Sequence, residues 1–320
     1  MKNWALFGLL GLIWGSSFLL IKIAVAPDGA IPNQVGLFDP LTLVAFRLGL
    51  GALGLLALVV LLKRKLPSDR RTWVLLATAG LINNAIPFAL ITWGERTIDS
   101  GLASVLDATV PLFSIVIAHF ALADEQISMN KIFGLIVGFA GVILLATRSL
   151  DPTHPNPLAG QLAVIGASFF YGLAAVFMRR TLRHVESIST AAFTVTFGAL
   201  FIILLTVLTV RPLPLLMAIQ PGAWLAILGL GIVNTFIAYT IYFTLLTTWG
   251  TRVTFVTYVT PPISVILGAV FNHEPVDWKL ILGTVLILSG VVAANVRLRR
   301  SKPTPVALSP MLDGTTGEAG

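Results

Sequence analysis

The sequence contains no cysteine, and only 11% of its 320 residues are charged. The lack of cysteine excludes disulfide bonds, thiolate metal sites and cysteine redox chemistry. The shortage of charge argues against an ordinary soluble domain, in which about 25% of residues are charged. The sequence also lacks an ATP-binding loop, a catalytic triad and a cluster of metal ligands. It therefore predicts no enzyme, no cofactor and no metal site.

Apolar residues make up 56% of the chain, and the mean hydropathy is +0.92. A helix needs about 20 apolar residues to cross a hydrocarbon core that is roughly 30 Å thick. Only helices and closed barrels satisfy the backbone polar groups in lipid, and the alternating pattern of a barrel is absent. We expect an all-α integral membrane protein with ten transmembrane helices, near residues 4–25, 40–62, 72–93, 98–121, 130–147, 158–178, 188–210, 222–245, 252–271 and 278–296.

The chain contains an internal repeat, because the same residue types recur in the same order about 150 residues later. The matching pairs are Trp73 and Trp224, Asn83 and Asn234, Glu125 and Glu274, Gly134 and Gly283, and Gly141 and Gly290. Each copy holds an odd number of predicted helices, so the two copies must have opposite orientations in the membrane. We expect a first five-helix repeat at residues 1–150, a second at 151–300, and a disordered cytoplasmic tail at 301–320.

Basic residues predict the orientation of the chain. Most of the 21 lysines and arginines fall at the ends of the predicted helices that share a side with the N-terminus. Cytoplasmic segments carry this excess, so we expect both termini in the cytoplasm and the protein in the plasma or inner membrane. The net charge of +7 fits contact with anionic lipid headgroups, so a nucleic-acid partner is not needed to explain it. We expect a monomer.

Several motifs occur in duplicate and carry a family resemblance. They are Pro111-Leu-Phe-Ser, Asp124-Glu125, Gly134 and Gly141-Val-Ile-Leu in the first repeat, Pro262-Ile-Ser, His273-Glu274, Gly283 and Gly290-Val-Val in the second, and Trp14-Gly15-Ser16-Ser17-Phe18 with Phe46-Arg47. Together they resemble the EamA family of the drug/metabolite transporter superfamily. The resemblance implies ten helices around a central cavity, and a function in the export of amino acids, other metabolites or toxic compounds, or in nucleotide-sugar transport. One departure is that no basic residue directly follows Glu125 or Glu274.

Charged residues deep within the predicted helices are candidates for a functional site, because burial of charge in the membrane is costly. Asp107 falls near mid-depth, and Arg47 and Lys22 lie in the same half of the bilayer. Asp107 could bind a substrate ammonium group or exchange a proton. Alternatively, Arg47 and Asp107 form a structural ion pair. Lys22 is expected to extend towards the lipid headgroups, although it could also attract an anionic group.

Amides and aromatic residues complete the predicted substrate site. Asn83, Asn84 and Asn234 lie near mid-depth, where they could bind a polar solute or join helices by hydrogen bonds. Trp14, Tyr171 and Tyr258 could stack on a solute, or they could pack as ordinary core residues.

Other residues predict movement or helix capping. Pro111, Pro261 and Pro262 interrupt helices and are candidate hinges. His119 is a candidate proton relay, with a plain structural role as the alternative. Glu125 and Glu274 stand at turns, where they are expected to cap helix N-termini. The glycines around Gly134 and Gly290 predict close packing between the fifth and tenth helices.

These features predict a secondary transporter that works by alternating access and exports amino acids or similar small amphipathic metabolites, with coupling to protons. Its partners would be a small-molecule substrate and the lipid bilayer. The alternatives are a facilitative channel, a carrier for another class such as nucleotide sugars or drug-like cations, and a membrane scaffold that transports nothing. A nucleotide-sugar carrier would need more intramembrane cations than Lys22 and Arg47.

Overall fold

The computed structural model describes residues 2–31, 35–64, 66–123, 125–152, 156–210 and 216–295. Within these ranges ten helical spans are long and apolar enough to cross a membrane, which confirms the predicted fold class. The predicted spans and the observed ones differ by only a few residues at each end. The tail at 301–320, predicted to be disordered, lies outside the described residues.

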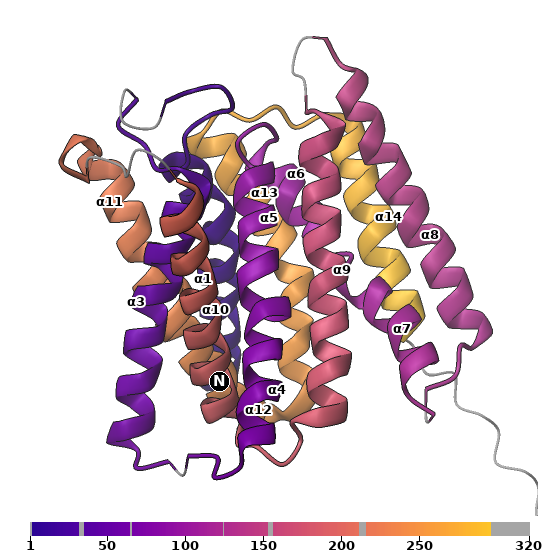
Figure 1. Ribbon diagram of the computed structural model, residues 1–320. Coiled ribbons are helices and arrows are strands. Elements are labelled where there is room, and N and C mark those ends of the chain that lie inside the picture. Colours follow the sequence, from indigo (N-terminus) through magenta and orange to yellow (C-terminus); the bar gives the residue numbers. More distant parts are fainter. Residues whose placement is uncertain are drawn as a thin grey trace, which may run out of the picture.

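The spans stand side by side as a bundle (Figure 1). In the first half they are α1 (Lys2–Ala24), α3 (Pro40–Leu61), α4 with α5 (Arg70–Gly80 and Ile86–Gly94), α6 with α7 (Ser100–Asp107 and Val110–Ala121), and α8 (Met129–Ala146). In the second half they are α9 (Leu158–Thr181), α10 (Ser187–Thr209), α11 with α12 (Pro221–Leu228 and Ala238–Trp249), α13 (Val256–Phe271) and α14 (Trp278–Asn295). Below, the face of the bundle at which α1 begins is the N-terminal face, and the other is the opposite face.

Helices of the two halves pack against each other in pairs. The pairs are α1 with α13, α3 with α10, and α8 with α14, and α5 and α7 both pack on α9. The pair of α8 and α14 forms one edge of the bundle (Figure 1). The two halves are therefore joined along several helix pairs.

Glycines make the contact between α8 and α14 unusually close. A Cβ atom added at Gly290 would lie 2.5 Å from the backbone nitrogen of Gly138 and 2.6 Å from the carbonyl oxygen of Gly134. In lipid, helix association depends on such close packing, because the hydrophobic effect does not drive apolar helices together. The predicted pairing of the fifth and tenth helices is confirmed.

The third and eighth spans each contain a π-helical segment, which the sequence analysis did not predict. One runs over Leu81–Ala85 and includes both Asn83 and Asn84, and the other runs over Gly229–Ile237 and includes Asn234. The repeat therefore extends to a backbone irregularity at matching positions. π-Helical turns occur frequently at functional sites.

The predicted hinge prolines differ in what they do to their helices. The fourth span is broken after Asp107, and Pro111 lies in the first turn of the new helix α7. Pro261 and Pro262 instead lie inside α13, which continues from Val256 to Phe271. Among the three candidate hinges, Pro111 alone stands at a break between helices. The break leaves Asp107 at the C-terminal end of the short helix α6.

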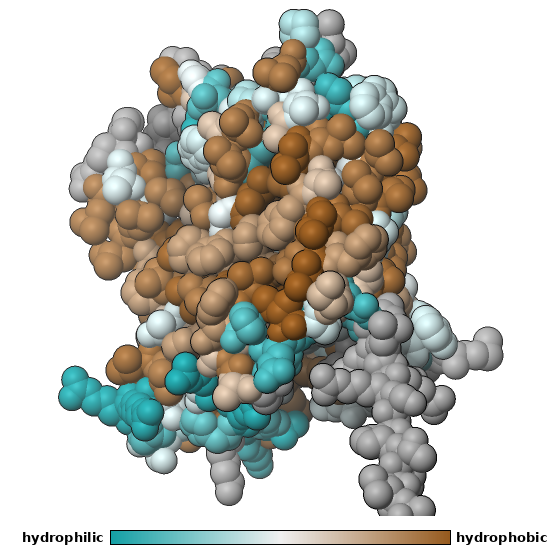
Figure 2. Space-filling model, turned by 90° about the vertical axis from the view of Figure 1, so that its right-hand side faces the viewer, coloured by the Kyte–Doolittle hydropathy of each residue, from teal (hydrophilic) through white to brown (hydrophobic). Residues whose placement is uncertain are grey.

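The distribution of hydrophobic residues on the surface fits a protein in a lipid bilayer. Hydrophobic residues cover the middle of the face seen in Figure 2, and hydrophilic residues gather towards its two ends. Large apolar side chains such as Leu61 and Phe120 are 77% and 82% exposed, which would be unfavourable in water and is favourable in lipid.

Candidate substrate site

Arg47 is buried in the bundle, and its guanidinium group is held in a defined orientation. One terminal nitrogen donates a hydrogen bond of 3.0 Å to Ser17 Oγ on α1. The guanidinium carbon lies 4.4 Å from the centre of the Phe88 ring on α5, which is a cation–π geometry. The Nε atom has no hydrogen-bond partner in the described part of the chain. One donor of a fixed, buried cation is thus left for another group.

Asp107 lies on a different helix, α6, and is half-buried. The Ser168 hydroxyl group on α9 lies 3.5 Å from Asp107 Oδ1, which is longer than its 3.1 Å contact with the carbonyl oxygen of Val164. Because Asp107 is the last residue of α6, the partial negative charge of the helix C-terminus adds to that of the carboxylate. The position therefore favours a cation or a proton.

No ion pair joins Arg47 to Asp107 among the described residues, so the alternative of a structural ion pair is not observed. Tyr171 on α9 lies near both charged groups. Its ring also packs edge-on against Phe88, with 6.4 Å between the ring centres. Two opposite charges are thus held near the same tyrosine without neutralising each other.

The three predicted asparagines have different environments. Asn234 donates from Nδ2 to the carbonyl oxygen of Ile13 and, over 3.3 Å, to Ser16 Oγ, which confirms the hydrogen-bond role between helices. Asn84 is fully buried, and neither its nitrogen nor its oxygen has a partner among the described residues. Asn83 is half-buried. Of the three, Asn84 has amide atoms that are buried and still available.

Other predicted site residues make their contacts elsewhere. Trp14 stacks on Tyr242 with 5.5 Å between ring centres. Tyr258 accepts a hydrogen bond of 3.2 Å from Asn295 at the end of α14. His119 is exposed near the end of α7, with Nδ1 at 3.4 Å from the carbonyl oxygen of Glu125. None of these recorded contacts reaches Arg47 or Asp107, so the structure does not bring all the candidates together.

At the opposite face, Glu274 caps the N-terminus of α6. Its carboxylate accepts hydrogen bonds from the backbone nitrogens of Ser100 and Gly101, at 2.9 and 3.0 Å, and from the Ser100 hydroxyl at 3.0 Å. The capping role predicted for Glu274 is confirmed. The cap links the loop after α13, in the second half, to a helix of the first half.

Glu125, the repeat partner of Glu274, has a different role. It forms ion pairs with Lys131 at 3.0 Å and Arg179 at 2.7 Å, and the capping role predicted for it is wrong. Hydrogen bonds from Arg179 and Lys131 lower the pKa of Glu125 below its ordinary value. The two turns are alike in sequence but bonded differently, so the two faces of the bundle are not equivalent.

Truncating Glu274 tests the cap. We expect Glu274→Ala to destabilise the folded protein by about 1–2 kcal/mol, because two backbone donors at the start of α6 lose their acceptor. Glu186→Ala is the control, since the Glu186 side chain is 45% exposed and pairs with Arg64 at the surface. Thermal unfolding of the purified protein in detergent measures both changes. Equal effects of the two substitutions would show that the cap adds nothing beyond an ordinary surface ion pair.

Lys22 and Glu95 meet in a buried site that sequence reasoning missed. The Lys22 ammonium group donates to the backbone carbonyl oxygens of Glu95 at 2.8 Å and Ile98 at 2.9 Å, so the predicted extension of Lys22 to the headgroups is wrong. The Glu95 side chain is 0% exposed. The sequence feature that could have pointed to this site is a glutamate directly after the third span, at the depth predicted for Lys22.

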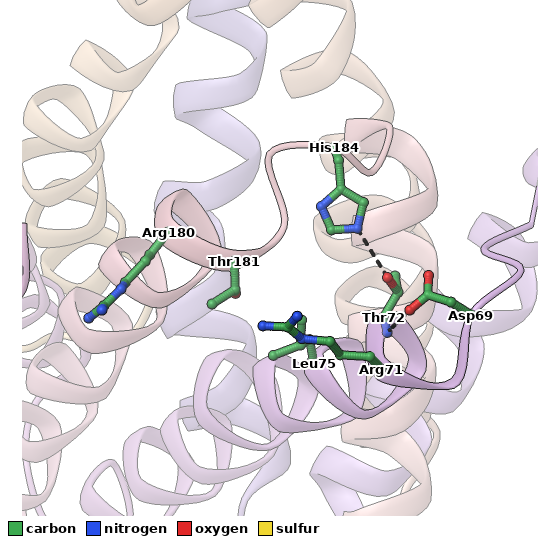
Figure 3. A pocket seen from close by; sticks show the side chains of 7 residues that line it. All are labelled: Asp69, Arg71, Thr72, Leu75, Arg180, Thr181 and His184. Carbon is green, nitrogen blue, oxygen red and sulfur yellow. Dashed lines mark hydrogen bonds between the residues drawn. The ribbon is translucent and has the colours of Figure 1, made fainter.

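A hollow of about 450 Å³ opens at the N-terminal face (Figure 3). It lies between the start of α4 and the end of α9, and His184 Nε2 lies 3.0 Å from Thr72 Oγ1 at its edge. Its lining consists of Asp69, Arg71, Thr72, Leu75, Arg180, Thr181 and His184. None of the residues predicted for the substrate site contributes to this lining.

Ten spans with buried, separated charges between two halves define a multi-pass membrane protein with a polar interior. The model of the EamA-like transporter family matches residues 2–147 and 158–296. The chain therefore belongs to the EamA-like transporter family, and it is a membrane transporter and not an enzyme. As such it acts on a small-molecule substrate in a lipid bilayer.

Similar proteins support this conclusion. The chain is 25% identical to the uncharacterized transporter YoaV of Bacillus subtilis, over 91% of this chain and 96% of that protein. It is 27% identical to the uncharacterized inner membrane transporter YedA of Escherichia coli, over 98% of this chain and 96% of that protein. A solved crystal structure shares the fold, with a TM-score of 0.63 and 20% identity, over 94% of this chain and 99% of that one.

Proposed function

We propose that the protein is a secondary carrier that exports amino acids or similar small amphipathic metabolites by alternating access. The observation that carries the proposal is the separation of Arg47 from Asp107. An unpaired cation and an unpaired acid can bind the carboxylate and the ammonium group of one zwitterion. The Arg47 Nε atom has a free N–H donor for a carboxylate, and Asp107 at the end of α6 suits an ammonium group.

The aromatic residues between the charges suit the rest of such a solute. Phe88 lies under the Arg47 guanidinium group, and Tyr171 lies against Phe88 and near Asp107. An apolar side chain can pack on these rings while both charged ends are bound. The buried Asn84 amide offers a further donor and acceptor, and Trp14, Tyr258 and Asn83 remain candidates for other stages of transport.

Alternating access would come from movement of the two halves relative to each other. The Glu274 cap holds the start of α6 at the opposite face, and breaking it would release α6 and the Asp107 at its end. Pro111 stands where such a movement of α6 can be absorbed. The halves meet within one chain, so a monomer is sufficient for this cycle.

The direction of transport and the coupling follow from chemistry. The excess of basic residues at the N-terminal face supports a cytoplasmic position for that face in the inner membrane. An Asp107 carboxylate that binds either the substrate ammonium group or a proton would exchange one for the other. An inward proton gradient would then drive export. A nucleotide-sugar carrier is disfavoured, because Lys22 already donates to two backbone carbonyls and Arg47 alone remains.

Proteoliposomes test the proposal without a chosen substrate. Vesicles with purified protein are incubated with a mixture of standard amino acids, amines, organic acids and nucleotide sugars, with and without a pH difference. The contents are then read by mass spectrometry. We expect enrichment of amino acids that increases with the pH gradient. Enrichment of amines alone, or of nucleotide sugars, would exclude the proposed substrate class.

A further inference from the structure

Glu95 is a buried carboxyl group without a hydrogen-bond partner. It ends α5, directly after the last residue of the third span, Gly94. The residue is 0% exposed, and among the described residues neither carboxylate oxygen has a partner. One turn earlier, the hydroxyl group of Thr92 is also fully buried and unpartnered. Such atoms in a native protein call for an explanation, such as a bound water or a functional role.

The charged neighbours of Glu95 do not form an ion pair with it. They are Lys22 on α1, Arg47 on α3, Asp107 on α6 and Glu274 in the loop after α13. The nearest cation, the Lys22 ammonium group, donates to the backbone carbonyl of Glu95 and not to its carboxylate. An ionised and unpaired carboxylate in this enclosed place would cost several kcal/mol, which protonation avoids.

Burial raises the pKa of Glu95 well above its ordinary value. Lys22 and Arg47 act in the opposite direction, while Glu274 and Asp107 add to the increase. The geometry leads to the same conclusion, since a proton is the smallest group that can satisfy an enclosed and otherwise unpartnered carboxylate.

We propose that Glu95 is a second proton-exchange site of the transport cycle, which takes up a proton from water at the opposite face and holds it while that face is closed. The role in transport rests on the proposed carrier function. In the step itself, a carboxylate oxygen of Glu95 forms an O–H bond while one O–H bond of a hydronium ion at that face breaks, which leaves a water molecule. Glu95 is suited to this role by its position, because the start of α6, which Glu274 caps, follows it in the chain by a short loop.

The protonation itself can be measured without any substrate. Infrared difference spectra of the protein in lipid nanodiscs, between acidic and alkaline pH, record the carbonyl band of protonated carboxyl groups. Asp107 is also proposed to bind a proton and can contribute to this band, so the variants are compared in an Asp107→Asn background. In that background we expect a band that titrates above the ordinary glutamate range and is lost in Glu95→Gln. Glu125→Gln is the control and should keep the band, because Glu125 is ion-paired at the other face. A band that survives unchanged in Glu95→Gln would overturn the proposal.

Transport separates a coupling role from a structural one. The assay uses the amino acid that wild-type vesicles enrich most. When its concentration is equal inside and outside the vesicles, Glu95→Gln should exchange it across the membrane as the wild type does. The concentration ratio that a pH gradient drives across the membrane should fall about tenfold or more. A tenfold fall corresponds to a loss of roughly 1.4 kcal/mol of driving force. Glu95→Asp should restore accumulation with a shifted pH profile. Equal losses of exchange and accumulation in a folded Glu95→Gln protein would mean a structural role.

The two proposals can fail separately. If wild-type vesicles enrich no member of the mixture in either pH condition, the proposed substrate class fails. The infrared titration then decides on its own whether Glu95 holds a proton in the closed state.

Discussion

Asp107→Asn is expected to abolish the accumulation of substrate that a pH gradient drives. The amide cannot take up a proton and cannot neutralise an ammonium group, so both proposed functions of Asp107 are lost. Loss of a hydrogen bond between charged groups should also raise the KM for exchange by about ten- to a hundredfold. Proteoliposomes preloaded with the enriched amino acid measure both quantities under the same conditions.

This pattern distinguishes Asp107 from Glu95. Glu95→Gln should leave the KM for exchange unchanged, whereas Asp107→Asn should change it. Asp28→Asn serves as a control, since the Asp28 side chain is 67% exposed and pairs with Arg96 at the surface. Unchanged dependence on pH in Asp107→Asn would remove Asp107 from the coupling mechanism.

Gly290→Val is expected to prevent the correct assembly of the bundle. A side chain at Gly290 would collide with the backbone of Gly134 and Gly138 on α8, and backbone atoms in a helix cannot move aside as a flexible side chain can. The two helices would have to separate, at a cost of about 3 kcal/mol or more. We expect fluorescence-detected size-exclusion chromatography to show that the variant has lost most of the monodisperse peak of the wild type.

Gly49→Val is the matched control. Gly49 also lies within a spanning helix, α3, but apart from its chain neighbours and the nearby backbone of its own helix, no atom of the described residues lies within 4 Å of where its Cβ would be. Its elution profile should remain like that of the wild type. If Gly290→Val behaves like Gly49→Val, the contact between α8 and α14 does not hold the two halves together.

The spans and their number could be predicted because each depends on local composition. A hydrocarbon core demands a minimum apolar length, and that demand is visible in any stretch of sequence such as residues 40–62. The cap by Glu274 was also predictable in kind, because a glutamate at a turn has few other roles. Its target, the start of α6 about 170 residues away, was not visible.

The charged site could be predicted only in part, because the relation between Arg47 and Asp107 depends on how two helices pack. The sequence placed both residues in one half of the bilayer but left open whether they touch. Repeat symmetry was misleading for the pair of Glu125 and Glu274, whose partners differ. Glu95 was missed because its burial results from the packing of a short connection, which hydropathy does not report.

The proposed carrier function depends most directly on recognition of both ends of a zwitterion by Arg47 and Asp107. The measurement that tests this is competition against transport of the most enriched amino acid by two of its analogues. One analogue is N-acetylated and lacks the ammonium charge, and the other is the decarboxylated amine. We predict that each competes at least about tenfold more weakly than the amino acid itself, since each leaves one buried charge unpaired. If either analogue competes as well as the amino acid, the two-charge site is not the recognition site.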